Sequence, residues 1–161
     1  MPHSELDLAD RPSRIPWPPI LLVGAIASAI VLGWIQPLPW PGLDDWPARA
    51  VGLGLGAAGI ALLVYAIATL RRHDTTVLPD KAASVLVTSG PYRRFRNPIY
   101  LADCLILLGV AELTKNVWFV FGAAVFAVLV TWLAILPEER HLERTFGEDF
   151  LNYKAKTRRW L

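Results

Sequence analysis

Residues 90–100 read GPYRRFRNPIY and join a basic loop to the start of an apolar segment. Three arginines within four residues directly precede Asn97-Pro98. Proline suits the first turn of a helix, where its missing N–H costs nothing, and asparagine suits the cap position before it. We therefore expect a helix to begin at Pro98, directly after a cluster of positive charge at a membrane surface.

The positive charge of this stretch permits two interpretations. Free N–H groups and the helix dipole at the start of the helix add to the charge of the arginines, so the element would suit an anionic group. Alternatively, the arginines anchor a transmembrane helix on the cytoplasmic side, as the positive-inside rule describes. The stretch alone leaves both interpretations open.

The composition of the chain is that of an integral membrane protein. A chain of 161 residues normally forms one domain, but here 54% of the residues are hydrophobic and seven are Trp, and the mean hydropathy is +0.39. Cys104 is the only cysteine, which excludes a disulfide framework and a Cys-rich metal site. His3, His73 and His141 show no ligand spacing, so we expect no metal site.

Four apolar stretches predict an all-α protein with four transmembrane helices, over about residues 17–35, 49–70, 98–113 and 117–136. We expect Pro137 to end the last one. Residues 1–16 are polar and predict an irregular cytoplasmic segment; an acidic start and the lack of a small-residue cleavage site argue against a signal peptide. Four glycines of the second stretch, some sharing one face, favour close helix packing over a ligand surface; they are Gly52, Gly54, Gly56 and Gly59.

The distribution of basic residues predicts the orientation of these helices. With both termini and the long loop at residues 71–97 in the cytoplasm, 14 of the 16 Lys and Arg residues lie on that side. Only Arg49 and Lys115 fall on the other side. The short loop at residues 37–47 carries Asp44 and Asp45 and no base, which agrees with that orientation.

The tail at residues 137–161 has the pattern of an amphipathic helix. Apolar and aromatic residues recur at steps of three and four, at Leu142, Phe146, Phe150, Tyr153 and Thr157, with bases elsewhere. We expect this helix to lie on the membrane surface or to pack over the cytoplasmic ends of the spans, with Gly147 as a possible break. The tail begins with Glu138 and Glu139 at the membrane boundary, where acids need partners.

Two segments together carry a family resemblance. LVTSGPYRRFRNPIYLAD, residues 86–103, and LPEERHLERTFGEDFLNYKAKTRRWL, residues 136–161, resemble the integral-membrane superfamily of isoprenylcysteine carboxyl methyltransferases and phospholipid methyltransferases. The resemblance covers roughly the second half of the chain, together with Thr75, Thr76 and Pro79. It implies one membrane methyltransferase domain over residues 17–161 that binds S-adenosylmethionine on the cytoplasmic side and methylates a lipophilic acceptor from the bilayer.

The resemblance also implies which residues form the cofactor site. The basic loop and helix start supply Gly90, Tyr92, Arg96, Asn97, Pro98 and Tyr100, and the acidic pair supplies Glu138 and Glu139. Further matches in the tail are Arg140, Leu142, Phe146, Gly147, Tyr153, Arg158 and Arg159. Our hypothesis is that Arg96 and Glu138 hold the cofactor and that the tail closes over it.

Two positions depart from the family pattern. Asn97 stands where the isoprenylcysteine enzymes have histidine, and an amide cannot become a cation, so it cannot shuttle a proton. Asp103 is an acid inside a span where relatives usually have a small or apolar residue; it would either face the acceptor or form a structural hydrogen bond.

The methyl acceptor is open at this stage. Arg140 or Arg144 could orient a carboxylate acceptor for O-methylation of the isoprenylcysteine kind, whereas Glu139 or Asp103 could take a proton from an amine acceptor such as an aminophospholipid. A non-enzymatic membrane scaffold or transporter subunit is the competing class. We expect lipids as partners and no nucleic acid, and a Trp- and Pro-rich chain without an organelle signal favours a bacterial plasma membrane.

Overall fold

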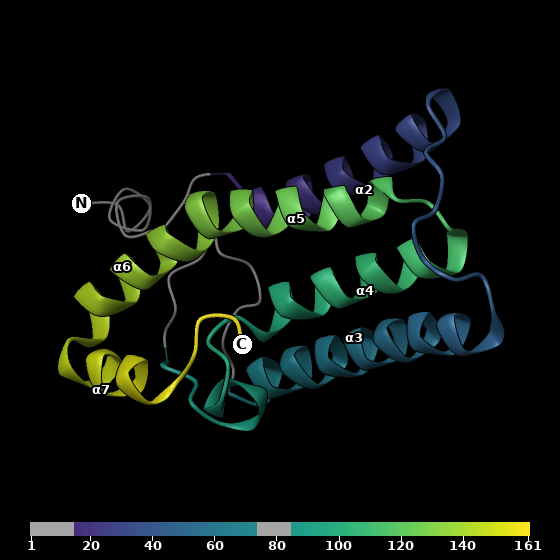
Figure 1. Ribbon diagram of the computed structural model, residues 1–161. Coiled ribbons are helices and arrows are strands. Elements are labelled where there is room, and N and C mark those ends of the chain that lie inside the picture. The colour runs from purple at the N-terminus through teal and green to yellow at the C-terminus, as the bar shows by residue number, and fades with distance from the viewer. Residues whose placement is uncertain (1–14, 74–84) are drawn as a thin grey trace.

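The computed structural model describes residues 15–73 and 85–161, and in these residues the chain is helical and contains no strand (Figure 1). The long helices form two layers, one with α2 and α5 and the other with α3 and α4 (Figure 1). Helices α4 and α5 join the layers. Helices that follow each other in the chain, α2 and α3, therefore lie in different layers.

The helix bounds agree closely with the expected spans. Helix α2 covers Trp17–Ile35 and α3 covers Trp46–Arg72. A short 3₁₀ helix, η1 at Gly90–Arg93, precedes α4 at Pro98–Thr114. The remaining elements are α5 at Trp118–Val130, the π-helical turn η2 at Thr131–Ile135, α6 at Leu136–Phe146 and α7 at Glu148–Lys156.

Three helices of the described chain are long and apolar enough to cross a membrane: Trp17–Ile35, Trp46–Arg72 and the continuous helix Trp118–Phe146. Large apolar side chains such as Val23, Val64 and Val125 are exposed on their outer faces. An apolar outer surface of this kind is what a lipid environment favours, and it identifies an integral membrane protein. Helix α4 has 17 residues and is mostly enclosed by its neighbours.

Glycines bring α3 and α4 close together, as their spacing predicted. A Cβ atom added to Gly109 would lie 2.6 Å from the backbone nitrogen of Gly56, and one added to Gly59 would lie 2.9 Å from the carbonyl oxygen of Ala102. Gly54, by contrast, faces open space. The glycines that face α4 therefore allow backbone contact between helices, as small residues do in membrane proteins.

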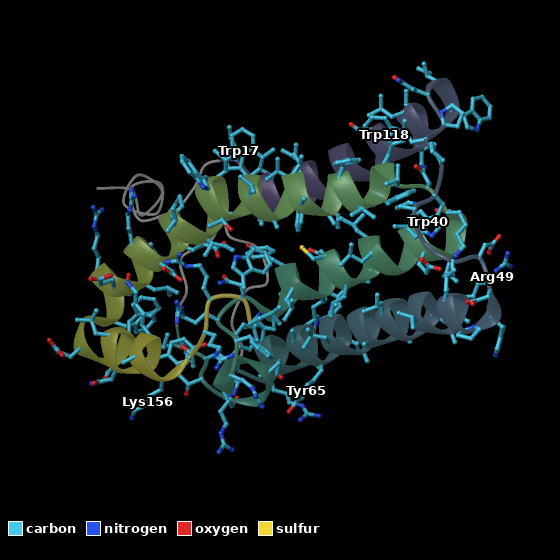
Figure 2. The ribbon with its side chains drawn as sticks, in the orientation of Figure 1. Trp17, Trp40, Arg49, Tyr65, Trp118 and Lys156 are labelled. Atoms are coloured by element: carbon cyan, nitrogen blue, oxygen red, sulfur yellow. The ribbon has the colours of Figure 1, made fainter. Side chains whose placement is uncertain are left out.

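The two short loops meet at the end of the molecule opposite α7. Figure 2 shows Trp40, Arg49 and Trp118 at that end and Lys156 at the other. Arg49 lies 3.0 Å and Lys115 3.7 Å from the same oxygen of Asp44. The hydrogen bond from Arg49 lowers the pKa of Asp44, so this carboxylate balances the two bases predicted for the far side.

The turn between α4 and α5 is as short as expected. Helix α4 continues to Thr114, and Lys115 follows with a left-handed φ of 54° while its N–H donates to the carbonyl of Ala111. This geometry ends a helix by satisfying one of its last carbonyls. The Lys115 side chain then bonds Glu112 and the carbonyl oxygen of Leu43, which ties the turn to the other short loop.

The prediction that Pro137 ends the fourth span was wrong. The helix widens into the π turn η2, in which the N–H of Leu136 donates to the carbonyl of Thr131, and α6 continues beyond Pro137. A proline lacks the N–H that an α-helix interior requires, but at the start of a helical segment it needs none. The π turn therefore lets one helix run from Trp118 to Phe146 and places the acidic pair beyond its apolar part.

The tail divides at Gly147, as its sequence indicated. Gly147 has a φ of +51°, which glycine adopts readily, and it separates α6 from α7. Phe150 in α7 is almost fully buried. After α7 the chain returns toward the start of α4 (Figure 1).

Candidate cofactor site

Gly90 positions the start of the basic loop against α3. Its φ is +58°, and a Cβ atom added there would lie 2.6 Å from the hydroxyl oxygen of Thr69. Thr69 is buried and donates to the carbonyl of Tyr65 within α3. Glycine is therefore required both for the backbone conformation and for the close approach.

Tyr92 links this loop to the tail. It is buried, and its carbonyl accepts a hydrogen bond of 2.7 Å from the hydroxyl of Tyr153 in α7. Burial raises the pKa of both phenols, so Tyr153 keeps the proton that it donates. The two tyrosines thus hold α7 over η1.

Arg96 lies at the centre of the contact between loop and tail. Its Nε donates to Glu139 Oε1 at 3.1 Å, and its Nη1 donates to the carbonyl oxygens of Lys154 and Thr157. Its side chain is only 10% exposed. The remaining terminal nitrogen, Nη2, makes no hydrogen bond with the described residues, so the guanidinium keeps a donor for a ligand.

Backbone pairing extends this contact along the last residues of the chain. The N–H of Arg96 donates to the carbonyl of Arg158, and the N–H of Arg158 donates to the carbonyl of Arg94. Asn97 is buried at the cap position of α4, as expected, but its side chain does not cap the helix. Its Nδ2 donates instead to the carbonyl of Arg159 at 3.0 Å.

Glu139 is buried between two arginines. Its carboxylate accepts from Arg96 Nε and, with both oxygens, from Arg159 Nε at 3.0 Å and Nη2 at 2.7 Å. This bond raises the pKa of Arg159, which therefore stays a cation. Both Glu139 oxygens are engaged, so its charge serves to join the loop, α6 and the last residues of the chain.

Glu138 has a different partner. Its Oε1 accepts a hydrogen bond of 3.0 Å from the hydroxyl of Tyr100, one turn inside α4. Its Oε2 makes no hydrogen bond with the described residues. The acid expected to contact the cofactor therefore retains one oxygen for a ligand, next to the start of α4.

The residues expected to act on the acceptor lie on two different helices. Asp103 is buried in α4, close to Tyr100. Arg140 and Arg144 are exposed on α6 and form no ion pair with the described residues. The role of these arginines in orienting a carboxylate stays a prediction, and Thr75, Thr76 and Pro79 lie outside the described residues.

Sequence reasoning missed the part that the last residues play in this site. Thr157 and Arg159 bind Arg96, Asn97 and Glu139, and the Trp160 indole donates to Thr131 Oγ1 in the π turn at 3.3 Å. Arg158 and Arg159 were noted only as matches to a family tail. The available signal was the pair Arg158-Arg159 directly before Trp160. A buried acid such as Glu139 requires cations from elsewhere in the chain, and this pair can supply one.

The donors and acceptors of this cluster fit the charged end of an amino-acid-containing nucleoside. Arg96 Nη2 and the first backbone N–H groups of α4 can bind a carboxylate, and Glu138 Oε2 can accept from an amine or a hydroxyl. Among residues 15–73 and 85–161, no three His, Cys, Asp or Glu side chains gather as a metal site would require.

Comparison with known proteins identifies the family. The model of the family described as phospholipid methyltransferase matches residues 47–149. The chain belongs to the phospholipid methyltransferase family. The matched range includes the basic loop, α4, α5 and the acidic pair, whereas the last residues that bind Arg96, Asn97 and Glu139 in this phospholipid methyltransferase family member lie beyond it.

Two curated relatives of this family member carry names related to metals. The nickel-cobalt-cadmium resistance protein NccN of Alcaligenes xylosoxydans xylosoxydans is 25% identical over 85% of this chain and 59% of its own length. The cobalt-zinc-cadmium resistance protein CzcN of Cupriavidus metallidurans is 30% identical over 65% of this chain and 46% of its own length. The chain thus spans about half the length of these relatives. No solved structure matches it.

Proposed function

We propose that this protein transfers the methyl group of S-adenosylmethionine to a lipophilic acceptor that enters from the bilayer. The observation that carries the proposal is the convergence of Arg96 and Tyr100, from the basic loop and α4, with Glu139 and Glu138 at the start of α6. The family membership supports methyl transfer as the chemistry. Acceptors of two kinds agree with it, a carboxylate for O-methylation of the isoprenylcysteine kind and an amine for N-methylation of an aminolipid.

In this proposal the residues of the site bind and align. Arg96 Nη2 and the start of α4 hold the carboxylate of the cofactor, and Glu138 Oε2 holds its amine or ribose hydroxyls. S-adenosylmethionine supplies a methyl group already activated on a sulfonium. The protein therefore has to orient the acceptor and exclude water, and no covalent nucleophile is needed.

The orientation in the membrane is part of the same proposal. Helix α4 would be the third of the four spans, short because its neighbours enclose it, and the end that carries α6, α7 and the basic loop would face the cytoplasm. A bacterial plasma membrane is the proposed location. The acidic Asp44 loop would then lie on the opposite side.

Binding of the cofactor product, S-adenosylhomocysteine, tests the proposal directly. Purified full-length protein should bind it in isothermal titration calorimetry, and Glu138→Gln should weaken binding by about tenfold or more, because a hydrogen bond to a charged group contributes about 1.5–3 kcal/mol. Glu148→Gln, a change of an exposed acid on α7, is the control and should leave the affinity unchanged.

Two results would count against the proposal. If neither S-adenosylmethionine nor its product binds, a scaffold or transporter subunit becomes the better description. If both bind but Glu138→Gln has wild-type affinity, the cofactor lies elsewhere. The methyl acceptor is found separately, by following labelled methyl groups from the cofactor into extracted lipids.

A further inference from the structure

Asp103 is a buried acid whose carboxylate has no polar partner among the described residues. Only 8% of its surface is exposed, and its carboxylate makes no hydrogen bond or ion pair with any described residue. It lies in the second turn of α4, and a small part of its carboxylate stays accessible. A carboxylate that is mostly buried among apolar side chains and has no partner is costly, so its presence calls for a role.

The other enclosed acids of the described chain all have partners. Glu139 is bound by Arg96 and Arg159, Glu138 by the Tyr100 hydroxyl, and Glu112 by Lys115. Asp103 differs from them in having neither a cation nor a hydroxyl. A structural role of the kind these acids have is therefore not visible for Asp103.

Asp103 lies further along α4 than Tyr100 of the candidate cofactor site, and on the same face of the helix. Tyr100, Asp103 and Leu107 follow steps of three and four, which place them along one side of the helix. Tyr100 and Leu107 pack in the core cluster with residues of α5. Three residues of an α-helix advance about 4.5 Å, so Asp103 lies roughly that far beyond the tyrosine that binds Glu138.

This position is where the reacting head of an acceptor would arrive if it came from the bilayer toward the cofactor site. An enclosed carboxylate without a counter-ion attracts a cation and repels a second carboxylate. We propose that Asp103 recognises the methyl acceptor and selects a lipophilic amine, bound as its ammonium form, over a lipophilic carboxylate. This inference rests on the proposed methyl transfer for the identity of the ligand as an acceptor.

Long-chain probes that differ only in their head group test this selection without requiring turnover. The full-length protein in phosphatidylcholine nanodiscs is titrated with a terminally brominated alkylamine, alkyl alcohol and fatty acid, and binding is followed by bromine quenching of tryptophan fluorescence. Wild-type protein should prefer the amine over the alcohol by at least about tenfold, and Asp103→Asn should remove the preference. Because partition into lipid is the same for both proteins, the difference reports the side chain.

A matched control and a second ligand make the outcome decisive. Glu112→Gln changes an acid at the other end of the same helix and should keep the preference for the amine, and S-adenosylhomocysteine affinity should stay within about twofold in Asp103→Asn. A wild-type preference for the fatty acid or the alcohol, or a preference for the amine that survives in Asp103→Asn, would overturn the inference. Failure of the wild-type protein to bind S-adenosylhomocysteine would instead overturn methyl transfer, whatever the amine does.

Discussion

Arg96 shows how one residue can serve both the fold and a ligand. Two of its nitrogens hold the tail through Glu139 and the carbonyls of Lys154 and Thr157, and the third remains available. The planar guanidinium makes this division possible because its donors point in fixed, different directions. A lysine at this position would offer a single charged nitrogen and could not reach the same set of partners.

The buried carboxylate of Glu139 should contribute strongly to stability. Glu139→Gln leaves Arg96 and Arg159 without their shared counter-ion, and breaking a buried ion pair typically costs about 3–5 kcal/mol. Thermal unfolding in detergent, followed by circular dichroism, should show a large decrease in the midpoint. Glu143→Gln, one turn later in α6, removes only the half-exposed pair with Lys154 and should cost about 0.5 kcal/mol or less. Equal effects of the two changes would contradict this account of Glu139.

At the scale of elements, the α3–α4 contact depends on glycines at backbone distance. A side chain at Gly109 would meet the Gly56 nitrogen and the Gly52 carbonyl, which are backbone atoms and cannot turn aside. Gly109→Leu should therefore separate the helices and cost about 2–3 kcal/mol or more. Gly54→Ala adds a methyl group in open space and should leave stability unchanged or slightly higher. Unfolding midpoints of the two variants decide between close packing and a tolerant interface.

The elements that could be predicted from the sequence are those with a local cause. Apolar length predicted the long helices, proline the start of α4 at Pro98, and glycine the break at Gly147. The π turn before Pro137 could not be predicted, because it results from fitting a continuous helix to a proline rather than from any residue preference. The pairing of α2 with α5 was equally hidden, since helices that are apolar all round do not show which face meets a neighbour.

The convergence of the two motifs was predictable, and the contacts that join them were not. The paired motifs correctly brought the basic loop and the acidic pair together, but the assignment of Arg96 and Glu138 to a cofactor stays a prediction. Which arginine binds which acid depends on the path of the last residues back to the start of α4. Contacts between residues far apart in the sequence fix that path. Arg159 and Glu139 are 20 residues apart and Asn97 and Arg159 are 62 apart.

At the scale of the whole molecule, the last residues join the two layers of helices. Residues 157–161 contact the loop before α4 through Arg96 and Asn97, α6 through Glu139, and the π turn through Trp160. The layer of α3 and α4 and the layer of α2 and α5 are thus tied at the end that holds the candidate site. If this tie positions Arg96 and Glu138 relative to each other, ligand binding should depend on these last residues.

Deleting residues 157–161 tests this dependence. The Arg96 amide loses its acceptor on Arg158, so its hydrogen exchange should accelerate strongly, while amides inside α3 should keep their protection. Affinity for S-adenosylhomocysteine should fall by at least about tenfold, because Arg96 and Glu139 lose partners that fix them. Deleting only Leu161, which is 76% exposed, should change neither quantity. Unaltered exchange at Arg96 in the longer deletion would show that the loop holds its form without the tail, and the joining of the two layers would then have to come from α4 and α5 alone.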